Sequence, residues 1–276
     1  MNLVQAAILG AVEGLTEFLP VSSTGHLILA AHAMGLVGDA MNDFEIVIQG
    51  GALLAVIWLY RRRVAELLAG ALRPHPTGRA LLIKLFVAFL PAAILGVLTH
   101  KAIKARLFGP LPVAAALFVG GIAMVLFEWW RRRKGAPPIA SVDAIPLSGA
   151  LAIGLLQCLS LWPGTSRAMV TILGALLIGC SNVAAAEFSF LLALPTLGAA
   201  TVFDLFQSRN SLLHGGAIGT GALLVGTATA AVVATIAIRS FLRYLTRHGL
   251  APFGWYRVAL ALAVWAILGG HHGGQP

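Results

Sequence analysis

Apolar residues run through this chain in long, nearly unbroken stretches. Six of them approach or exceed the roughly 20 residues that a helix needs to cross a bilayer: roughly 43–60, 82–99, 112–130, 184–206, 213–238 and 252–270. Two further apolar regions, 3–36 and 146–180, are interrupted near the middle by a proline and polar residues. Each of these predicts two short helices around a turn, a re-entrant hairpin that enters the membrane and returns on the same side. The pattern predicts an all-α polytopic membrane protein with six transmembrane helices and two re-entrant helical hairpins.

The two hairpins are expected to have opposite orientations, because three full spans separate them. Basic residues gather in alternate loops, around 61–63, 131–134 and 239–247. The positive-inside rule places these loops in the cytoplasm and both termini outside. Both polar patches also share a Pro-x-Ser/Thr-Ser element. We therefore predict an inverted-topology repeat within one integral membrane domain, the first repeat at 1–135 and the second at 146–270, with a site at the bilayer midplane.

The composition agrees with a membrane protein and restricts the classes of partner that the protein is expected to bind. Hydrophobic residues make up 59% of the chain and charged residues 11%, and the mean hydropathy is +0.90. These values exclude an ordinary soluble domain. The net charge of +9 does not predict nucleic-acid binding, because the basic residues lie at the ends of apolar stretches, where they act as topology signals and contact lipid headgroups. Cys158 and Cys180 are expected to be small buried residues rather than a disulfide or a metal pair.

The first patch, residues 13–26, begins with two carboxylates. Glu13 and Glu17 are four residues apart, so a helix presents both on one face. Each charge costs roughly 2.5–3.5 kcal/mol inside the membrane, which favours a functional role over a packing one. Two carboxylates on one face are suited to a shared Mg²⁺ or Ca²⁺, or to a division into a base and an electrostatic group.

Hydroxyl groups and an imidazole follow the break at Pro20. A helix that starts there places Ser22 and Ser23 within about one turn of His26, an arrangement of nucleophile and base. The alternative for the serines is a structural one, since Ser is a common N-cap residue.

The second patch, residues 157–167, has the features of an anion-binding turn. Pro163 and Gly164 turn the chain, and Thr165 and Ser166 are placed to cap a following helix, whose free N–H groups favour phosphate. Arg167 offers a planar fork that matches phosphate oxygens, and Thr171 lies four residues on. The alternative for Arg167 is a structural ion pair with Glu13 or Glu17.

These motifs resemble the bacterial undecaprenyl pyrophosphate phosphatases, also called bacitracin resistance proteins. The likeness covers nearly the whole chain and is carried by three motifs: Glu-Gly-Leu-Thr-Glu-Phe-Leu-Pro-Val-Ser-Ser-Thr-Gly-His at 13–26, Pro-Gly-Thr-Ser-Arg at 163–167 with Thr171, and Glu-Phe-Ser-Phe-Leu-Leu at 187–192. The family pattern has Ser then Gly after the Ser-Arg pair, whereas this chain has Ala168 and Met169. That departure puts in doubt only a secondary hydrogen bond to phosphate.

The resemblance implies hydrolysis of undecaprenyl diphosphate to undecaprenyl phosphate and inorganic phosphate, which recycles the lipid carrier for cell-wall polysaccharide synthesis and confers bacitracin resistance. It also implies dependence on a divalent cation, Mg²⁺ or Ca²⁺, and a multi-pass protein of the bacterial inner membrane whose active site opens to the periplasmic side. The expected partners are the isoprenoid lipid diphosphate and membrane lipids but no nucleic acid, and a homodimer stays an open alternative to a monomer.

Together the motifs and the resemblance assign roles to individual residues. The catalytic residues are Glu17, Ser23, His26 and Arg167. The phosphate-binding residues are Ser22, Gly164, Ser166, Arg167 and Thr171, and the metal ligands are Glu13 and Glu17. The nucleophile stays open between Ser23, His26 and a water molecule.

Two other functions fit parts of the pattern. Broken helices in an inverted repeat are also typical of secondary transporters, so a lipid-phosphate flippase or a transporter with a midplane anion site is the main alternative. A type-2 phosphatidic acid phosphatase shares a faint likeness at 23–26, but the upstream Lys and Arg motif of that family is missing here.

Overall fold

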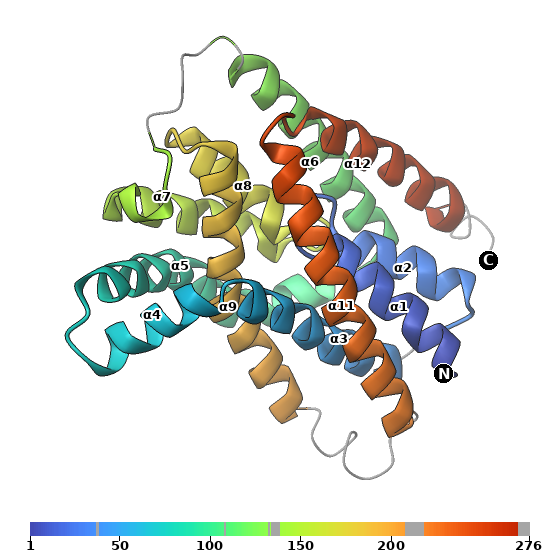
Figure 1. The fold of residues 1–276 in the computed structure, drawn as a ribbon. Coiled ribbons are helices and arrows are strands. Elements are labelled where there is room, and N and C mark those ends of the chain that lie inside the picture. Colours follow the sequence, from blue (N-terminus) through green and yellow to red (C-terminus); the bar gives the residue numbers. More distant parts are fainter. Residues whose placement is uncertain (37–38, 108, 132, 134–138, 208–217, 270–276) are drawn as a thin grey trace. The chain divides into compact units, whose positions relative to one another are not determined.

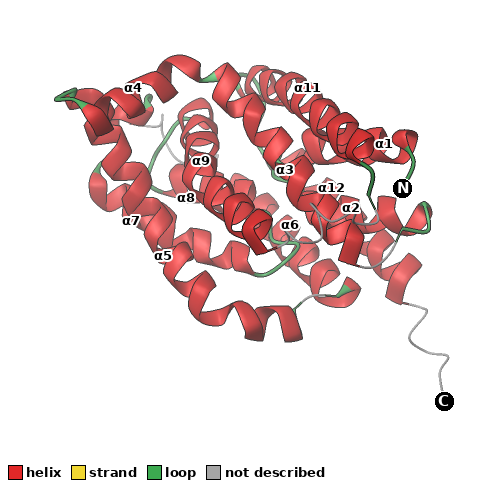
Figure 2. Ribbon diagram, turned by 90° about the horizontal axis from the view of Figure 1, so that it is seen from below, coloured by secondary structure: helices red, strands yellow, loops and turns green. Residues whose placement is uncertain are grey.

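The computed structural model describes residues 1–36, 39–107, 109–131, 133, 139–207 and 218–269. Within these ranges the chain forms helices and loops, and pairing of the β type is limited to an isolated bridge between Ile139 and Cys180 (Figure 2). Both cysteines are free, Cys180 buried and Cys158 half-buried. The prediction of an all-α membrane protein is confirmed.

The helices follow the order of the predicted segments (Figure 1). Their bounds are α1 Leu3–Thr16, α2 Ser23–Ala33, α3 Asp39–Leu59, α4 Arg61–Leu72, α5 Pro76–Arg106, α6 Pro110–Arg131, η1 Val142–Ala144, α7 Leu147–Gln157, η2 Cys158–Leu161, α8 Arg167–Leu177, α9 Asn182–Gln207, α11 Thr220–Leu245, α12 Ala251–Val264 and η3 Trp265–Gly269. Both apolar regions that were predicted to be broken are pairs of short helices, α1 with α2 and α7–η2 with α8.

Four helices of the described residues are long and apolar enough to cross a membrane: Pro76–Thr99, Leu111–Arg131, Asn182–Phe206 and Thr220–Leu245. A fifth span is formed if α3 and α4, which meet at a bend of 88°, count as one. The predicted span at 252–270 is a shorter apolar helix, Ala251–Ile267. Residues 213–217 and 270 of the predicted spans lie outside the described residues. The total of six spans stays a prediction, as does the inverted repeat.

The chain divides into two compact units, and each draws on both halves of the sequence. Unit 1 comprises Met1–Leu19, His26–Leu82 and Phe190–Phe241, and unit 2 comprises Pro20–Gly25, Ile83–Ser189 and Leu242–Pro276. The turn of the first hairpin therefore belongs to unit 2, although the rest of that hairpin belongs to unit 1. These units are interwoven along the chain and differ from the two predicted repeats, whose boundaries stay a prediction.

In unit 1, a seam of small residues joins α1 to α11. A Cβ atom added to Gly10 would lie 2.3 Å from the carbonyl oxygen of Gly226, and one added to Gly14 would lie 2.5 Å from that of Ala230. Small residues four apart let two helix backbones approach closely, which is how helices associate in the absence of water. The seam fixes the helix that carries Glu13 and ends next to Glu17.

In unit 2, α12 packs along α6, and the two helices lie side by side in Figure 1. Their closest approach is again at glycines, since a Cβ atom on Gly121 would lie 2.7 Å from the carbonyl oxygen of Gly254. The short helices α7 and α8 pack against each other as the second hairpin.

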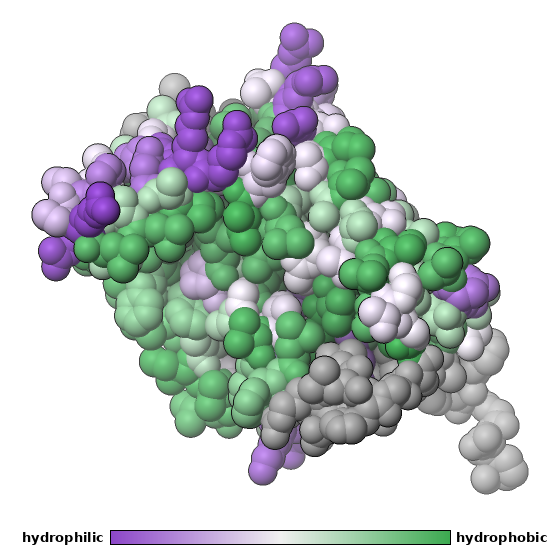
Figure 3. All heavy atoms as spheres, turned by 60° about the horizontal axis from the view of Figure 1, so that its bottom comes forward, coloured by the Kyte–Doolittle hydropathy of each residue, from purple (hydrophilic) through white to green (hydrophobic). Residues whose placement is uncertain are grey.

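The surface has the distribution expected for a protein in lipid. Large apolar side chains such as Trp58, Val97 and Val202 are more than half exposed, and Figure 3 shows hydrophobic atoms over much of the visible face with hydrophilic ones gathered in patches. Such extensive exposed apolar surface is rare in soluble monomers. Together with the apolar helices, it identifies an integral membrane protein.

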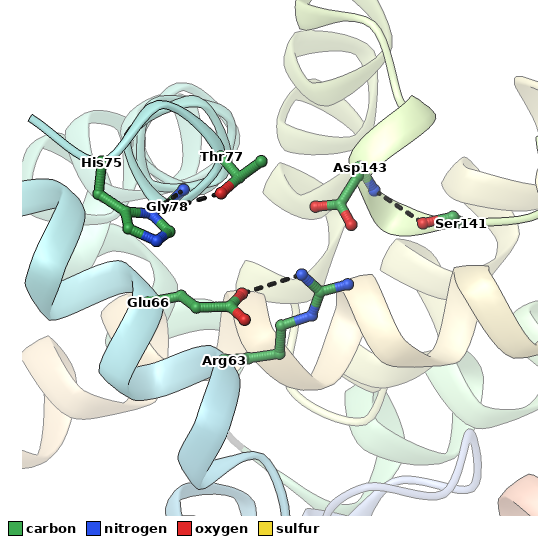
Figure 4. Close-up of polar contacts among 7 residues, drawn as sticks. All are labelled: Arg63, Glu66, His75, Thr77, Gly78, Ser141 and Asp143. Carbon is green, nitrogen blue, oxygen red and sulfur yellow. Dashed lines mark hydrogen bonds and ion pairs between the residues drawn. The ribbon is translucent and has the colours of Figure 1, made fainter.

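Polar contacts occur within α4 and at the starts of α5 and η1 (Figure 4). In α4, Arg63 pairs with Glu66 at 3.0 Å. The backbone N–H of Gly78 donates to Nδ1 of His75 at 3.1 Å and so caps the start of α5. The hydroxyl of Ser141 accepts from the backbone N–H of Asp143 at 3.2 Å, at the start of η1.

The close packing of α1 on α11 predicts that a single methyl group added at this seam lowers the stability of the protein. Gly10→Ala should lower the free energy of unfolding of the protein in detergent by about 1–3 kcal/mol, because the added Cβ meets a backbone carbonyl that has no room to move. Gly198→Ala on α9 is the matched control, since its Cβ would make only an ordinary contact of 3.7 Å with Leu53. Thermal unfolding followed by circular dichroism measures both variants. Equal stability of Gly10→Ala and the wild type would contradict the close packing of α1 on α11.

Candidate active site

The first break positions two serines at the start of α2. After α1 ends at Thr16, the chain turns through Pro20, and α2 begins at Ser23. Ser22 has φ of 73°, and its buried hydroxyl accepts a weak hydrogen bond of 3.5 Å from the backbone N–H of Gly25. Ser22 is therefore the residue that caps α2, and Ser23 is the first helical residue.

The second break has the same local geometry. Ser166 has φ of 71°, and its hydroxyl accepts a hydrogen bond of 3.2 Å from the backbone N–H of Met169, which caps α8. Gly164 has φ of 94°, and a Cβ there would lie 2.6 Å from the carbonyl oxygen of Val113. This position requires glycine for its conformation and for its close contact.

Both capping serines adopt a conformation that costs a non-glycine residue about 1–3 kcal/mol. Ser22 and Ser166 are the described non-glycine residues with positive φ. Such strain persists where the surroundings enforce it, and it gathers at functional sites. The first N–H groups of α2 and α8 lack acceptors within their helices, and the helix dipole adds positive potential there. Each break therefore presents a site suited to an anion such as phosphate.

In unit 1, Glu13 lies on α1 and Glu17 is the residue that caps the C-terminal end of this helix. Glu13 and Glu17 are both buried, with exposed fractions of 2% and 7%, and the backbone N–H of Glu17 bonds to the carbonyl of Glu13 at 2.9 Å. The two residues are therefore successive along one helical face, as the sequence predicted. No cluster of three or more Cys, His, Asp or Glu suited to a metal occurs in the ranges that the structure describes. A pair of carboxylates still fits Mg²⁺, which commonly takes one or two protein carboxylates and completes its shell with water and substrate phosphate.

His26 and Ser23 share the first turn of α2. Both side chains are partly exposed, whereas Ser22 is buried. Of the two serines, Ser23 is thus the more accessible to a substrate, and His26 follows it by one helical turn.

Arg167 is the first residue of α8 and is held by a network that sequence reasoning did not anticipate. Its Nη1 donates to the carbonyl oxygen of Ser189 at 2.9 Å and lies 3.4 Å from the Ser189 hydroxyl. The Thr171 hydroxyl donates to the carbonyl oxygen of Arg167 at 2.8 Å and lies 2.6 Å from the Ser189 hydroxyl. Since Thr171 uses its proton on that carbonyl, Ser189 donates to Thr171 and accepts from Arg167.

Within this network, the Thr171 side chain contacts protein groups. Its side chain is fully buried, and its hydroxyl contacts protein groups on two sides. Direct contact of Thr171 with phosphate stays a prediction, whereas its contact with Ser189, which holds Arg167, is observed. A sequence signal for Ser189 existed, because it is a hydroxyl residue between two phenylalanines in an apolar helix.

Two further buried polar residues were not assigned a role from the sequence. Gln157, at the end of α7, is 1% exposed, and neither polar atom of its amide has a hydrogen-bond partner among the described residues. Arg257, in α12, is completely buried. An arginine inside an apolar stretch is itself a signal of function, and it could have been recognised as one.

The predicted site residues fall into two groups. Glu13, Glu17 and His26 belong to unit 1, and Ser22, Ser23, Gly164, Ser166, Arg167 and Thr171 belong to unit 2. The structure therefore places Ser22 in the same unit as Ser166 and Arg167, which are far from it in the sequence. The carboxylates and the imidazole lie in the other unit, and the unit boundaries along the chain fall at Leu19–Pro20 and Gly25–His26.

Comparison with known proteins yields relatives along nearly the whole chain. The undecaprenyl-diphosphatase of Sorangium cellulosum is 55% identical over 261 residues, 94% of this chain and 85% of the relative. Undecaprenyl-diphosphatase 2 of Rhodospirillum rubrum is 48% identical, covering 96% of this chain and 94% of the relative. Undecaprenyl-diphosphatase 1 of Chromobacterium violaceum is 46% identical, covering 95% of each chain.

A family model gives the same result. The model described as "Bacitracin resistance protein BacA" matches residues 6–263, which include all but the first residues of the first hairpin, the whole second hairpin and every residue of the candidate site. Since the match spans far more than half of the chain, and the relatives agree with it, this protein belongs to the bacitracin resistance protein BacA family.

Proposed function

We propose that this protein hydrolyses undecaprenyl diphosphate to undecaprenyl phosphate and inorganic phosphate, which returns the lipid carrier to cell-wall polysaccharide synthesis. The observation that carries this proposal is the pair of serine-capped helix starts, Ser22 with α2 and Ser166 with α8, inside a chain that is otherwise apolar. Relatives that are 55% and 48% identical to this chain bear the name undecaprenyl-diphosphatase. An apolar body with an anion site suits a substrate that has an isoprenoid tail and a diphosphate head.

Binding of the diphosphate is assigned to unit 2. The N–H groups at the start of α8 favour phosphate oxygens, and the guanidinium of Arg167 matches them as a planar fork. Ser189 and Thr171 restrict the orientation of Arg167, so the fork loses little conformational freedom when the substrate binds.

A divalent cation, Mg²⁺ or Ca²⁺, is proposed at Glu13 and Glu17. Their carboxylates are buried on one helical face and provide the oxygen donors that these ions prefer. When bound, the cation would neutralise charge on the phosphoryl group during transfer.

Two routes are open for the attack on the terminal phosphoryl group. In one, the Ser23 hydroxyl attacks phosphorus, His26 accepts its proton, and the bond to the bridging oxygen breaks to release undecaprenyl phosphate; water then hydrolyses the phosphoserine. In the other, Glu17 or His26 removes a proton from water, which attacks directly. Ser23 and His26 share a helical turn, which suits the first route.

The proposed location is the bacterial inner membrane, with the site open to the periplasmic side. The bend after α3 supports this orientation. Arg61 and Arg62 begin α4 and are exposed, and the guanidinium of Arg61 lies 5.4 Å from the ring centroid of Trp58. A basic, aromatic boundary of this type is typical of the cytoplasmic end of a membrane helix.

Removal of the cation and of its ligands provides the first test. Purified protein in detergent should release phosphate from undecaprenyl diphosphate with Mg²⁺ or Ca²⁺, and EDTA should abolish release. Glu17→Gln should lower kcat by on the order of 10²-fold or more, since it removes a carboxylate from the reacting centre. Glu66→Gln on α4 is the control, because Glu66 pairs with Arg63 outside the site.

The outcomes of this test separate enzyme from transporter. Phosphate release that persists in EDTA would contradict the metal proposal. A folded wild type that releases no phosphate under any condition would contradict the enzymatic proposal and favour the alternative of a flippase or transporter, for which broken helices are also typical.

Ser23→Ala distinguishes the two routes. If Ser23 is the nucleophile, as its exposure at the start of α2 leads us to expect, the variant should lose turnover. The wild type, rapidly quenched with substrate labelled in the terminal phosphate, should then carry label on Ser23. Retained turnover in Ser23→Ala with no labelled protein would establish direct attack by water.

The network around Arg167 predicts a role for Ser189. Ser189→Ala should lower kcat/KM by about tenfold, because hydrogen bonds to charged groups contribute about 1.5–3 kcal/mol and one of those that orient Arg167 is lost. Ser148→Ala, an exposed position in the first turn of α7, is the control. Unchanged kcat/KM in Ser189→Ala would show that Arg167 is positioned without the hydroxyl.

A further inference from the structure

Arg257 is a buried arginine whose partners are backbone carbonyl groups. Its Nη1 donates to the carbonyl oxygen of Pro20 at 3.4 Å. Its Nη2 donates to the carbonyl oxygens of Ala116 at 3.2 Å and of Gly164 at 3.0 Å. All four residues belong to unit 2. Among the described residues, the guanidinium thus bonds to carbonyl dipoles and not to a carboxylate, so its positive charge is only partly compensated.

Glycines on α6 make room for this side chain. A Cβ on Gly120 would lie 2.5 Å from Nη2 of Arg257 and 2.9 Å from the sulfur of Met169. The contact of Gly121 with Gly254 brings α6 and α12 close enough for the guanidinium to reach past α6 to both turns. The position of Arg257 is therefore built into the packing of these helices.

The carbonyl groups of Pro20 and Gly164 occupy the same position in the two breaks. Pro20 precedes the capping residue Ser22 by two positions, and Gly164 precedes Ser166 by two positions. Both serines have positive φ, and both accept from a backbone N–H three residues on. One guanidinium therefore bonds to equivalent carbonyls of both turns, which places the turns next to each other in unit 2.

This correspondence differs from the one that the shared prolines indicate. An alignment of Pro20 with Pro163 pairs Ser22 with Thr165, whereas the backbone geometry pairs Ser22 with Ser166. In the structural pairing, Pro20 corresponds to Gly164 and Ser23 corresponds to Arg167. The first residue of α2, Ser23, is the candidate nucleophile. The first residue of α8, Arg167, carries the guanidinium proposed to bind phosphate.

A buried guanidinium is costly unless its hydrogen bonds are satisfied, and breaking them leaves an uncompensated charge. The strained serines need surroundings that enforce their conformation. Arg257 meets that need for both turns at once, because it fixes the peptide group two residues before each serine.

We propose that Arg257 is a positioning residue for the diphosphate site: by bonding to Pro20 and Gly164 it holds both serine-capped turns in their anion-binding geometry. Its charge, which no carboxylate of the described residues neutralises, adds to the positive potential at the starts of α2 and α8. The inference rests on the proposed function, in that these helix starts hold the phosphoryl groups.

The test uses the full-length protein in detergent with undecaprenyl diphosphate. Arg257→Lys keeps the charge but replaces a fork that reaches three carbonyls with a point charge. We expect kcat/KM per folded molecule to fall by on the order of 10²-fold, the typical effect of displacing a catalytic group by about 1 Å. Arg247→Lys, an exposed position beyond α11, should retain the wild-type value. Folded fractions come from size exclusion and thermal unfolding.

A double substitution separates positioning from general stability. If Arg257 acts through the capped turns, then Arg257→Lys and Ser166→Ala should be non-additive, and the double variant should be little worse than the more impaired single variant. A residue that only stabilises the fold would lower the unfolding temperature, leave kcat/KM per folded molecule unchanged and give additive effects.

A second variant keeps the proposal testable if Arg257→Lys does not fold. Gly120→Ala retains the arginine but intrudes on its guanidinium, and it should produce the same fall in kcat/KM. Wild-type kcat/KM per folded molecule in Arg257→Lys, or in Gly120→Ala where the lysine variant does not fold, would overturn the proposal, as would additivity with Ser166→Ala. Failure of the wild type itself to release phosphate would instead overturn the proposed function.

Discussion

Backbone groups that leave a helix inside a membrane must find new partners, because no water is available to them. This constraint acts on both broken helices of the protein. The carbonyls of Pro20 and Gly164, freed where the helices end, are bonded by Arg257. The indole N–H of Trp162 in turn bonds to the carbonyl of Pro112 at 3.1 Å, which fixes the second turn against the start of α6. The broken helices are tolerated because side chains distant in the sequence form hydrogen bonds to the backbone carbonyl groups.

The same constraint explains why the breaks are suited to binding an anion. A helix that restarts inside the membrane exposes its first N–H groups, and a capping serine satisfies only one of them. At Ser22 and Ser166 the remaining donors and the helix dipole favour a negatively charged ligand. The geometry of the breaks therefore supports the proposed diphosphate site with few charged side chains. Arg167, oriented by Ser189, adds a planar fork that matches phosphate geometry.

Local patterns in the sequence predicted much of this arrangement. Proline and polar residues within apolar stretches predicted both hairpins, and the spacing of Glu13 and Glu17 predicted a shared helical face, as α1 shows. Spans were less predictable: the stretch at 252–270 forms a shorter helix, and the one at 43–60 continues across a bend into α4. Length and hydropathy do not encode such bends, which depend on what each helix packs against.

The sequence by itself determined the class of the protein, the positions of the two breaks and the chemical groups at each, because hydropathy, proline placement and residue type act locally. Tertiary structure alone decided how those groups are held. Ser189 contacts Arg167 from a different helix, and Arg257 reaches both turns from α12 through the space that Gly120 leaves. Contacts between residues so distant along the chain depend on helix packing, and a single sequence carries no local signal of which carbonyl a buried arginine will meet.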